Sequence, residues 1–363
     1  MRILQVTPTY FSDRSIIGGG ERYVTNLCLA ALAAAPDRTL ACSVLSFSRT
    51  RDFVRVQEGL GLHLIPGDPA DVASVASGAL DDLIAEHDVV HVHQCLSPLG
   101  IFAAARARIA GKVVLGTDHG GDLFAELEYY PRLGRLFDVF HAQSDFAAAA
   151  FAGLDRPVRL IRGPVDDRMF ALATTRRQRG LFVSIGRILP HKGYEHAIAA
   201  LPRGARLVIA GRIYDRDYFD RLLQAAAGRD VHFETQLGDA EVQHLLGQAS
   251  LLVHGGTHFG PDGTFYHKPE LLALAPLEAM CLGTPAVVSR AGALGELAVL
   301  RGCRSYADAQ ELAAMLEAAA AGDLFALSPA EIRDDAVAQF GLRQFGEHYL
   351  ALLRESGRWE RAA

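Results

Sequence analysis

The sequence contains no uninterrupted apolar run of the roughly 20 residues that a membrane-spanning helix needs. Its opening, MRILQVTP, also lacks the apolar core and the small-residue cleavage site of a secretory leader. Five cysteines are scattered along the chain, and no two of them are spaced as C-x-x-C. These absences predict a cytoplasmic protein whose cysteines are reduced and buried, with no zinc site and no indicated membrane contact.

The sequence also lacks a large excess of charge of one sign. Its 36 basic and 42 acidic residues give a formal net charge of −6, which excludes the strongly basic class of nucleic-acid-binding proteins. Lysine is scarce: only Lys112, Lys192 and Lys268 occur, so the other 33 basic residues (36 − 3) are arginines. A lysine in a chain that otherwise uses arginine is a candidate for a specific role.

The 363 residues, half of them hydrophobic, are enough for two domains with separate cores. Short apolar runs alternate with amphipathic segments, which predicts parallel sheets covered on both faces by helices. In the first half we expect helices over 21–32, 70–86 and 99–109, and strands over 2–7, 40–47, 62–65, 89–92, 113–117 and 139–142. In the second half we expect a last helix over 342–354 and strands over 181–185, 206–210, 231–233, 251–254 and 286–289.

A turn-forming cluster, Gly163-Pro164-Val165-Asp166, precedes a polar, arginine-rich stretch over 167–179. We place the domain boundary there. The N-terminal domain then comprises 1–166 plus 345–363, and the C-terminal domain comprises 167–344. Both have the pattern of a doubly wound, Rossmann-like α/β unit. Because such units bind ligands outside the carboxyl ends of their strands, we expect the active site in the crevice between the two.

Two glycine-containing clusters follow strands in the first half. Gly18-Gly19-Gly20 precedes a predicted helix, where backbone amides and the helix dipole favour a phosphate; a flexible turn is the alternative. The run 117–122 places His119 next to glycines at the end of a strand, which suits contact with a substrate. A capping or core histidine is the alternative there. His91 and His93 lie on or next to a strand and are expected to be structural or to support site residues without direct contact to a substrate.

A third cluster lies between a strand and a helix in the second half. Arg187 and Lys192 stand five residues apart in the turn 186–193, so both can reach one diphosphate. The alternative is a pair of solvated loop cations.

The fourth cluster contains two glutamates. Glu270 and Glu278 stand eight residues apart in an apolar stretch, with Pro276 between them. Proline disfavours one continuous helix, so we expect a loop at Glu270 that leads into a helix with Pro276 in its first turn. Burying carboxylates among apolar residues is costly unless they bind something. The alternative is one helix-capping glutamate and one exposed glutamate.

Together these motifs resemble glycosyltransferase family 4, which are retaining enzymes of the GT-B fold. The resemblance rests on 18–22, 117–119, 184–193, 270–280 and 283–285, and the glutamate spacing fits the E-x7-E signature of the family. It implies two Rossmann-like doubly wound domains facing each other across a cleft, with a C-terminal helix crossing back to the N-terminal domain. The run 271–274 departs from the glycines that the family usually has after its first glutamate.

The resemblance also implies roles for the site residues. Arg187 and Lys192 would neutralise the diphosphate of a nucleotide-sugar donor, and Glu278 would accept hydrogen bonds from its ribose. Glu270 would contact the sugar near the reacting centre, and His119 would position that sugar. The remaining donor contacts would come from Gly19, Gly20, Gly211, Arg212, Gln236, Leu272, Ala273 and Leu274.

By the same resemblance, a sugar moves from a nucleotide-diphosphate sugar to a hydroxyl of an acceptor glycan, glycolipid or small molecule. A UDP-sugar is the preferred donor and GDP-mannose the alternative. Two cations stand where a metal would otherwise act, so no metal or other cofactor is expected. Two other interpretations stay open, namely a GT-B sugar-nucleotide epimerase and a non-catalytic GT-B partner subunit. The segment 255–267 is expected to shape the sugar pocket or the acceptor side, with a solvent loop as the alternative.

Overall fold

The computed structural model describes residues 1–8, 19–35, 40–120, 131–173 and 175–355. The chain divides into two compact units: unit 1 comprises Met1–Pro164 and Leu342–Ala363, and unit 2 comprises Val165–Gly341. The boundaries expected at 166 and 345 differ from these by two and three residues (166 − 164 and 345 − 342). Gly18, Gly121 and Asp122, which the sequence analysis singled out, lie outside the described residues, as does 356–363.

Unit 1 is built on an eight-stranded sheet in the order β3-β4-β2-β1-β5-β6-β7-β8. Its strand pairs are parallel, except that β3 pairs antiparallel with β4 at the edge. The central strands are buried on both faces, so their sequences are mostly apolar, and the polar residues that they contain are buried as well. The strands are β1 (Arg2–Val6), β2 (Ala41–Ser48), β3 (Asp52–Gln57), β4 (Leu60–Pro66), β5 (Val89–His93), β6 (Val113–Thr117), β7 (Val139–Ala142) and β8 (Val158–Leu160).

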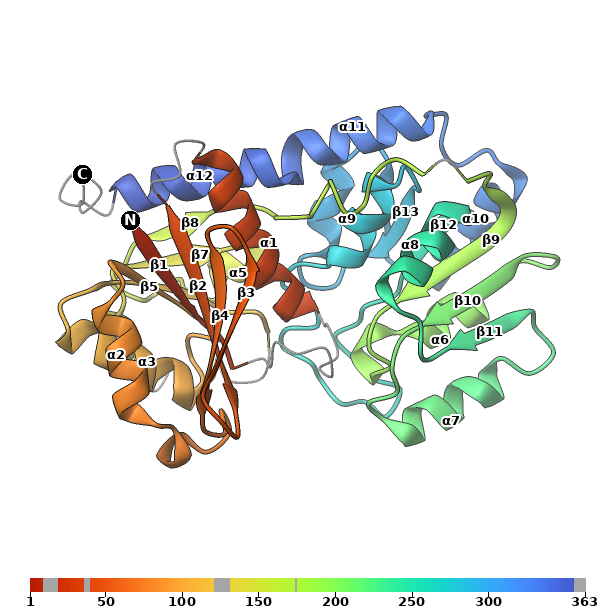
Figure 1. Cartoon of the computed structure of the whole chain (residues 1–363). Coiled ribbons are helices and arrows are strands. Elements are labelled where there is room, and N and C mark those ends of the chain that lie inside the picture. The colour runs from red at the N-terminus through yellow and green to blue at the C-terminus, as the bar shows by residue number, and fades with distance from the viewer. Residues whose placement is uncertain (9–18, 36–39, 121–130, 174, 356–363) are drawn as a thin grey trace. The chain divides into compact units, whose positions relative to one another are not determined.

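The helices of unit 1 lie on both faces of this sheet (Figure 1). α1 (Gly19–Ala34) connects β1 to its neighbour β2, whereas α3 (Pro98–Ile109) connects β5 to β6 in the opposite direction along the sheet. Because parallel crossovers are right-handed, these two connections place their helices on opposite faces. The strand order reverses between β1 and β5, so the loops that follow these strands diverge at the carboxyl edge.

Unit 2 contains a six-stranded parallel sheet in the order β11-β10-β9-β12-β13-β14. Its strand order reverses between β9 and β12, so the loops after these strands flank the expected ligand position. The strands are β9 (Gln178–Ile185), β10 (Arg206–Ala210), β11 (Val231–Glu234), β12 (Ala249–His254), β13 (Ala286–Ser289) and β14 (Cys303–Tyr306). The helices are α6 (Tyr194–Ala199), α7 (Arg216–Ala225), α8 (Asp239–Gln248), α9 (Leu274–Cys281), α10 (Ala309–Ala321) and α11 (Pro329–Phe340).

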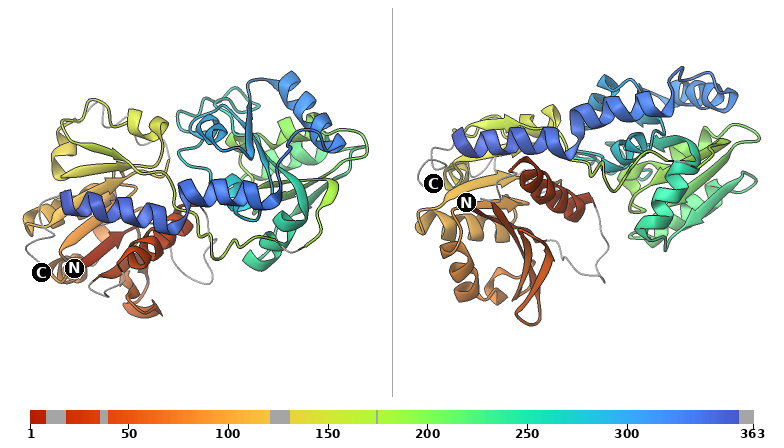
Figure 2. Two further views of the ribbon diagram at one scale, coloured as in Figure 1. Left: turned by 90° about the horizontal axis from the view of Figure 1, so that it is seen from above. Right: turned by 45° about the horizontal axis from the view of Figure 1, so that its top comes forward.

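The last helix, α12 (Leu342–Glu355), returns to unit 1 and runs beside α1 (Figures 1 and 2). Its buried side chains include Phe345, Tyr349 and Leu353, whose spacing of four places them on one face of the helix. Gly346 lets the two helix backbones approach, because a Cβ there would lie 2.1 Å from the carbonyl oxygen of Ala30. The expected return of the last helix is thus confirmed.

The expected helix over 70–86 is wrong in its first half. Asp71 caps a short 3-10 turn over Val72–Ser74, and Val75 then adopts an extended conformation, so α2 (Ser77–Ala85) starts only after the turn. The sequence analysis also missed β3. All six residues of that strand are exposed, and its apolar and polar residues alternate over only four positions, 54–57, which is a weak signal.

We predict that Gly346→Ala lowers the free energy of unfolding by about 1–3 kcal/mol, because its new methyl group would overlap the α1 backbone. Gly78→Ala in α2 is the matched control, since a Cβ at Gly78 would meet nothing within 4 Å. We expect that control to be neutral or stabilising by up to about 1 kcal/mol. Urea unfolding followed by circular dichroism measures both variants. Equal stabilities would contradict the close packing of α1 on α12.

Candidate active site

Glycines bring the loops at the carboxyl edge of unit 2 into backbone contact. A Cβ on Gly211 would lie 1.8 Å from the Gly186 carbonyl oxygen, and one on Gly193 would lie 2.0 Å from the Gly255 carbonyl oxygen. Gly193 also has a φ of 60°, in the left-handed region that favours glycine. The loop after β9 is therefore held against the loops after β10 and β12. This contact brings Lys192 to the chain segment that leads to Glu270.

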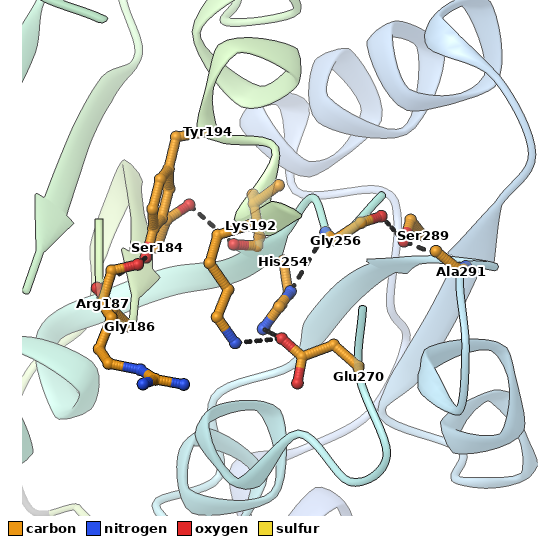
Figure 3. A network of polar contacts seen from close by, with 11 residues as sticks. Ser184, Gly186, Arg187, Lys192, Tyr194, His254, Gly256, Glu270, Ser289 and Ala291 are labelled. Atoms are coloured by element: carbon orange, nitrogen blue, oxygen red, sulfur yellow. Dashed lines mark hydrogen bonds and ion pairs between the residues drawn. The ribbon is translucent and has the colours of Figure 1, made fainter. Parts of the chain in front are cut away.

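Lys192 and Glu270 form a buried ion pair at this edge (Figure 3). Their side chains are only 14% and 8% exposed. His254, the last residue of β12, makes a second contact, with its Nε2 3.3 Å from Glu270 Oε1. The Gly256 N–H donates to His254 Nδ1 at 3.3 Å, so the ring proton lies on Nε2 and is directed at the carboxylate. The carboxylate therefore has two donors.

The electrostatics of the site keep Glu270 ionised. Burial by itself would raise the pKa of Glu270, but the Lys192 ammonium and the His254 hydrogen bond outweigh it and hold the pKa well below its ordinary value. The pKa of the neighbouring His191 is shifted downward, which is the direction that burial favours for a histidine. Burial and then the charge of Lys192 lower its pKa to about 4, so His191 is neutral at pH 7. The charges at this point are thus one carboxylate and one ammonium.

Arg187 is exposed, and its guanidinium lies over the ring of Tyr214 at 5.5 Å from the centroid. The Tyr194 hydroxyl donates to the Gly186 carbonyl at 2.7 Å, which holds the backbone just before Arg187. Figure 3 shows the guanidinium directed toward the side on which the Lys192 ammonium lies. The alternative of two solvated loop cations is therefore wrong for Lys192, which is buried and paired.

The segment after Glu270 has the expected loop and helix. α9 begins at Leu274 and carries Pro276 in its first turn. Glu278 lies on this helix and is 6% exposed, so the interpretation of one capping and one exposed glutamate is wrong. Ala273 occupies the N-cap and offers no side-chain acceptor to the first amides of α9. The backbone of Leu272, Ala273 and Leu274 thus forms an uncapped helix start, which favours an anion.

The segment 255–267 is a small hairpin with an anchored base. Phe259 and Phe265 pair as an antiparallel bridge near its tip, where they are 61% and 46% exposed. At its base, the Thr257 N–H donates to the carbonyl of His191 at 2.9 Å, one residue before Lys192. His258 accepts the Gly292 N–H at 3.2 Å. The role expected for this segment in shaping the site stays a prediction.

In unit 1, His119 follows β6 and is half-buried. Its Nε2 lies 2.7 Å from Nδ1 of His93, the last residue of β5. Gln94, at a φ of 50°, donates its side-chain amide to the Gly120 carbonyl at 2.9 Å and accepts the His119 N–H at 3.2 Å. Burial and then the neighbouring His141 lower the pKa of His119 to about 3, so the ring is neutral at pH 7. Both the backbone and the ring of His119 are therefore held in place.

The other predicted donor residues lie at helix starts and strand ends. Gly19 and Gly20 are the first two residues of α1 in unit 1. In unit 2, Gly211 and Arg212 directly follow β10, and Gln236 is exposed in the bend after β11. Arg212 and Gln236 thus lie at the same carboxyl edge of the sheet as Arg187.

Sequence reasoning missed His254 and Tyr194, which hold the Glu270 carboxylate and the loop before Arg187. It expected His93 to be structural or to support a site residue, and the contact with His119 agrees with the second of these roles. The signal that could have found His93 and His254 is their position, because each is the last residue of a strand at the carboxyl edge of a parallel sheet.

Across the described residues, no group of three or more His, Cys, Asp or Glu side chains is arranged to hold a metal ion. None of the helices described there is both long and apolar enough to cross a bilayer. The five cysteines are buried, and none forms a disulfide.

Two Rossmann-like units with a last helix that returns to the first define the GT-B class of fold, and solved GT-B structures share it over nearly the whole chain. HepE of Anabaena, solved in complex with UDP and glucose, matches with a TM-score of 0.73 at 17% identity over 98% of this chain and 100% of HepE. Sucrose-phosphate synthase from Thermosynechococcus elongatus matches with a TM-score of 0.74 at 17% identity over 98% of both chains. At such identities the likeness shows the fold alone.

Two family models match consecutive parts of the chain. Glycosyltransferase Family 4 covers residues 17–168, and Glycosyl transferases group 1 covers residues 169–321. The chain therefore belongs to the family 4 glycosyltransferases, as its motifs indicated. Glycogen synthase of Mycobacterium tuberculosis is 33% identical over 154 residues, which are 40% of this chain and 34% of that protein. The match thus spans about a third of that relative.

We predict that Lys192→Met lowers the free energy of unfolding of the ligand-free protein by about 3–5 kcal/mol, because it leaves the buried Glu270 carboxylate without its ammonium. Adding Glu270→Gln to this variant should restore most of the loss, since the amide carries no charge. Chemical denaturation at pH 7 measures both. A Lys192→Met protein as stable as the wild type would contradict the buried pair.

Proposed function

We propose that this protein is a retaining glycosyltransferase that moves a sugar from a nucleotide-diphosphate sugar to a hydroxyl of an acceptor glycan, glycolipid or small molecule. The observation that carries the proposal is the buried pair of Lys192 and Glu270 where the strand order of unit 2 reverses, with Arg187 close by. An apolar ligand would not need such a pair, whose desolvation is costly. A ligand with both phosphates and hydroxyls can bind to both members of the pair, with its phosphates at the Lys192 ammonium and its hydroxyls at the Glu270 carboxylate.

The donors at this edge fit a diphosphate. The Lys192 ammonium has three N–H donors and gives one to Glu270, so two are left for phosphate oxygens. Arg187 adds a planar guanidinium, and the uncapped start of α9 adds backbone amides. Because the departing diphosphate gains negative charge as the glycosidic bond breaks, donors held in place beforehand stabilise the transition state more than the substrate.

The two glutamates take the hydroxyls of the donor. Glu270 is ionised and therefore only accepts hydrogen bonds, which suits the sugar hydroxyls, and Glu278 takes the ribose hydroxyls. His119 positions the sugar. Gly19 and Gly20 approach the phosphates, and the nucleotide base lies near Gly211, Arg212 and Gln236.

Transfer proceeds on one face of the sugar. The acceptor oxygen bonds to the anomeric carbon as the bond from that carbon to the diphosphate oxygen breaks. Because attack and departure occur on the same face, the configuration at this carbon is retained. The acceptor proton passes to the departing oxygen. Arg187 and Lys192 balance the charge of the diphosphate, so no metal is needed. A UDP-sugar is the preferred donor and GDP-mannose the alternative; the UDP and glucose held by HepE support the first.

A panel of nucleotide sugars tests the proposal. A true donor at 100 times its Kd adds about 2.7 kcal/mol of stability, which a thermal shift detects. The stabilising donor is then incubated with candidate acceptors, and nucleotide release and product configuration are measured. Conversion of the donor to its epimer without nucleotide release would replace transfer with epimerisation. A panel without any stabilising nucleotide sugar would favour a non-catalytic subunit.

We predict that Arg187→Ala lowers kcat about 100-fold, because it removes a donor that acts mainly in the transition state. Lys192→Ala should do the same, and the double variant should be less than additive since both cations serve one diphosphate. Glu278→Gln should instead raise the KM for the donor, because a ribose contact is the same in the ground and transition states. Steady-state kinetics of the variants measure both constants.

The matched control is Arg304→Ala. Arg304 is also exposed and also lies over an aromatic ring, Phe325, at 5.4 Å, but it belongs to β14 rather than to a loop at the carboxyl edge. We expect its kcat to stay within about twofold of the wild type. A near-wild-type kcat for a folded Arg187→Ala protein would remove that residue from the diphosphate site.

We also predict that EDTA leaves transferase activity intact, because Arg187 and Lys192 supply the charge that a metal would provide. Activity is measured with and without the chelator, followed by addition of Mg²⁺ or Mn²⁺. Loss on chelation that either metal restores would overturn metal independence.

A further inference from the structure

Unit 1 contains a continuous chain of buried polar side chains that ends at His119. The chain crosses four adjacent strands and includes a residue of the returning helix α12. None of its six members before His119 is more than 1% exposed. In order they are His141 on β7, Thr117 on β6, His91 on β5, Tyr349 on α12, Gln5 on β1 and His93 on β5.

The direction of the hydrogen bonds is set at the far end. His141 Nε2 lies 3.2 Å from the carbonyl of Ile161, which only accepts, so this ring carries its proton on Nε2 and a lone pair on Nδ1. The Tyr23 hydroxyl oxygen, 3.4 Å from the same Nε2, can accept this N–H as well. The Thr117 hydroxyl lies 3.1 Å from that Nδ1 and also 3.1 Å from the His141 carbonyl oxygen. Both atoms only accept, so Thr117 donates its proton to His141. With its single proton used, Thr117 Oγ1 accepts from His91 Nε2 at 2.8 Å.

The same reasoning continues through α12. His91 Nδ1 is now an acceptor, so Tyr349 donates its hydroxyl to it at 3.0 Å. The Tyr349 oxygen accepts from Gln5 Nε2 at 3.4 Å, and Gln5 Oε1 accepts from His93 Nε2 at 2.8 Å. His93 Nδ1 therefore has a lone pair, which the His119 Nε2–H meets at 2.7 Å. The chain requires the proton of His119 on Nε2.

The contacts of Gln143, at the His119 end of the chain, lead independently to the same tautomer of His119. Gln143 Nε2 lies 2.8 Å from the carbonyl of Asp118, so this atom is the donor of the amide. Its second N–H reaches His119 Nδ1 at 3.4 Å, which requires a lone pair there. Each ring holds one proton only, because burial in the first place lowers the pKa values of His91 and His93 well below their ordinary range and lowers that of His141 to about 4.

We propose that this chain fixes His119 as the neutral tautomer protonated on Nε2, so that its Nδ1 lone pair accepts a hydrogen bond from a hydroxyl of the donor sugar. The inference rests on the proposed function, in which His119 contacts that sugar. His93, Gln5 and Tyr349 are then positioning residues, since they act through His119. The opposite tautomer would point a lone pair at His93 Nδ1 and offer the sugar a donor in place of an acceptor.

Access to Nδ1 is compatible with this role. The contact from Gln143 is at the long end of the hydrogen-bond range, and the same nitrogen keeps its shorter bond to Asp118. A sugar hydroxyl can therefore take the lone pair while Gln143 Nε2 keeps its hydrogen bond to the Asp118 carbonyl. Tyr23 packs against the His119 ring at 4.8 Å between centroids and limits its rotation.

The test compares His93→Leu with His93→Asn, two side chains of nearly equal shape. Asparagine offers Oδ1 to the His119 N–H, whereas leucine offers only methyl groups. Imidazole nitrogen shifts in ¹⁵N-labelled, ligand-free protein report the tautomer, and His119→Gln identifies the His119 signals. We expect protonation on Nε2 in the wild type and in His93→Asn, and mixed tautomers in His93→Leu.

Transfer kinetics form the second arm. We expect kcat to fall about tenfold or more in His93→Leu and to stay within about threefold in His93→Asn. His87→Leu is the matched control, because His87 is as buried as His93 but bonds to the Leu83 carbonyl outside the chain. Melting temperatures establish that each variant folds. Should His93→Leu not fold, Tyr349→Phe removes one oxygen from the chain and is expected to mix the His119 tautomers as well.

The outcomes separate this inference from the proposed function. A wild-type His119 protonated on Nδ1, or a tautomer unchanged in both His93→Leu and Tyr349→Phe, would overturn the directed chain whatever the enzyme does. A shifted tautomer with equal kcat in both His93 variants would overturn the positioning role while transfer itself stands. A wild-type protein that transfers no sugar would overturn the proposed function. The ¹⁵N chemical shifts would still show whether the hydrogen-bonded chain fixes the His119 tautomer.

Discussion

The ion pair between Lys192 and Glu270 is the interaction on which the candidate site depends. A carboxylate that is 8% exposed stays ionised only if donors replace its water, and here an ammonium and an imidazole do so. Because Lys192 follows β9 and Glu270 follows β12, this requirement also joins two loops at the reversal of strand order. The site is therefore charged and ordered before any ligand arrives, which is the condition for electrostatic catalysis.

Backbone contacts make this pairing sterically feasible. Gly193 meets Gly255, and Gly211 meets Gly186, at distances that no Cβ would permit. Gly292, at a φ of 56°, approaches the Glu270 carbonyl in the same way, since a Cβ there would lie 2.4 Å from that oxygen. Glycine thus serves here to bring one backbone against another, so that the side chains of adjacent residues can meet.

The two units differ in the charge of the polar side chains that they bury. At its candidate site, unit 2 pairs a charged lysine with a charged glutamate. The hydrogen-bonded chain of unit 1 instead contains four histidines whose pKa values are all lowered, so they are neutral at pH 7. In a neutral ring, the direction of the hydrogen bonds decides which nitrogen carries the proton. A nucleotide sugar has the same two parts, a charged diphosphate and a neutral sugar, which agrees with the proposed donor. Through Tyr349, the returning helix α12 joins the ordering of unit 1.

By itself, the sequence determined the strand–helix alternation, the approximate division into two domains, the family, and the loop that leads into a helix with Pro276 in its first turn. These follow from local apolar periods and from fixed spacings such as the eight residues between Glu270 and Glu278. It did not reveal β3, whose residues are all exposed. It also placed the start of the helix expected over 70–86 too early, because Asp71 caps a short turn there.

Only the tertiary structure decided which polar groups meet. Lys192 holds Glu270 because β9 lies next to β12, and His93 holds His119 because β5 lies next to β6. Tyr349 joins that chain from 258 residues beyond His91, a separation at which no local pattern carries information. Local physics therefore fixes the elements and their order along the chain. The partners of a buried charge or tautomer depend on which strands become neighbours, and that is a property of the whole fold.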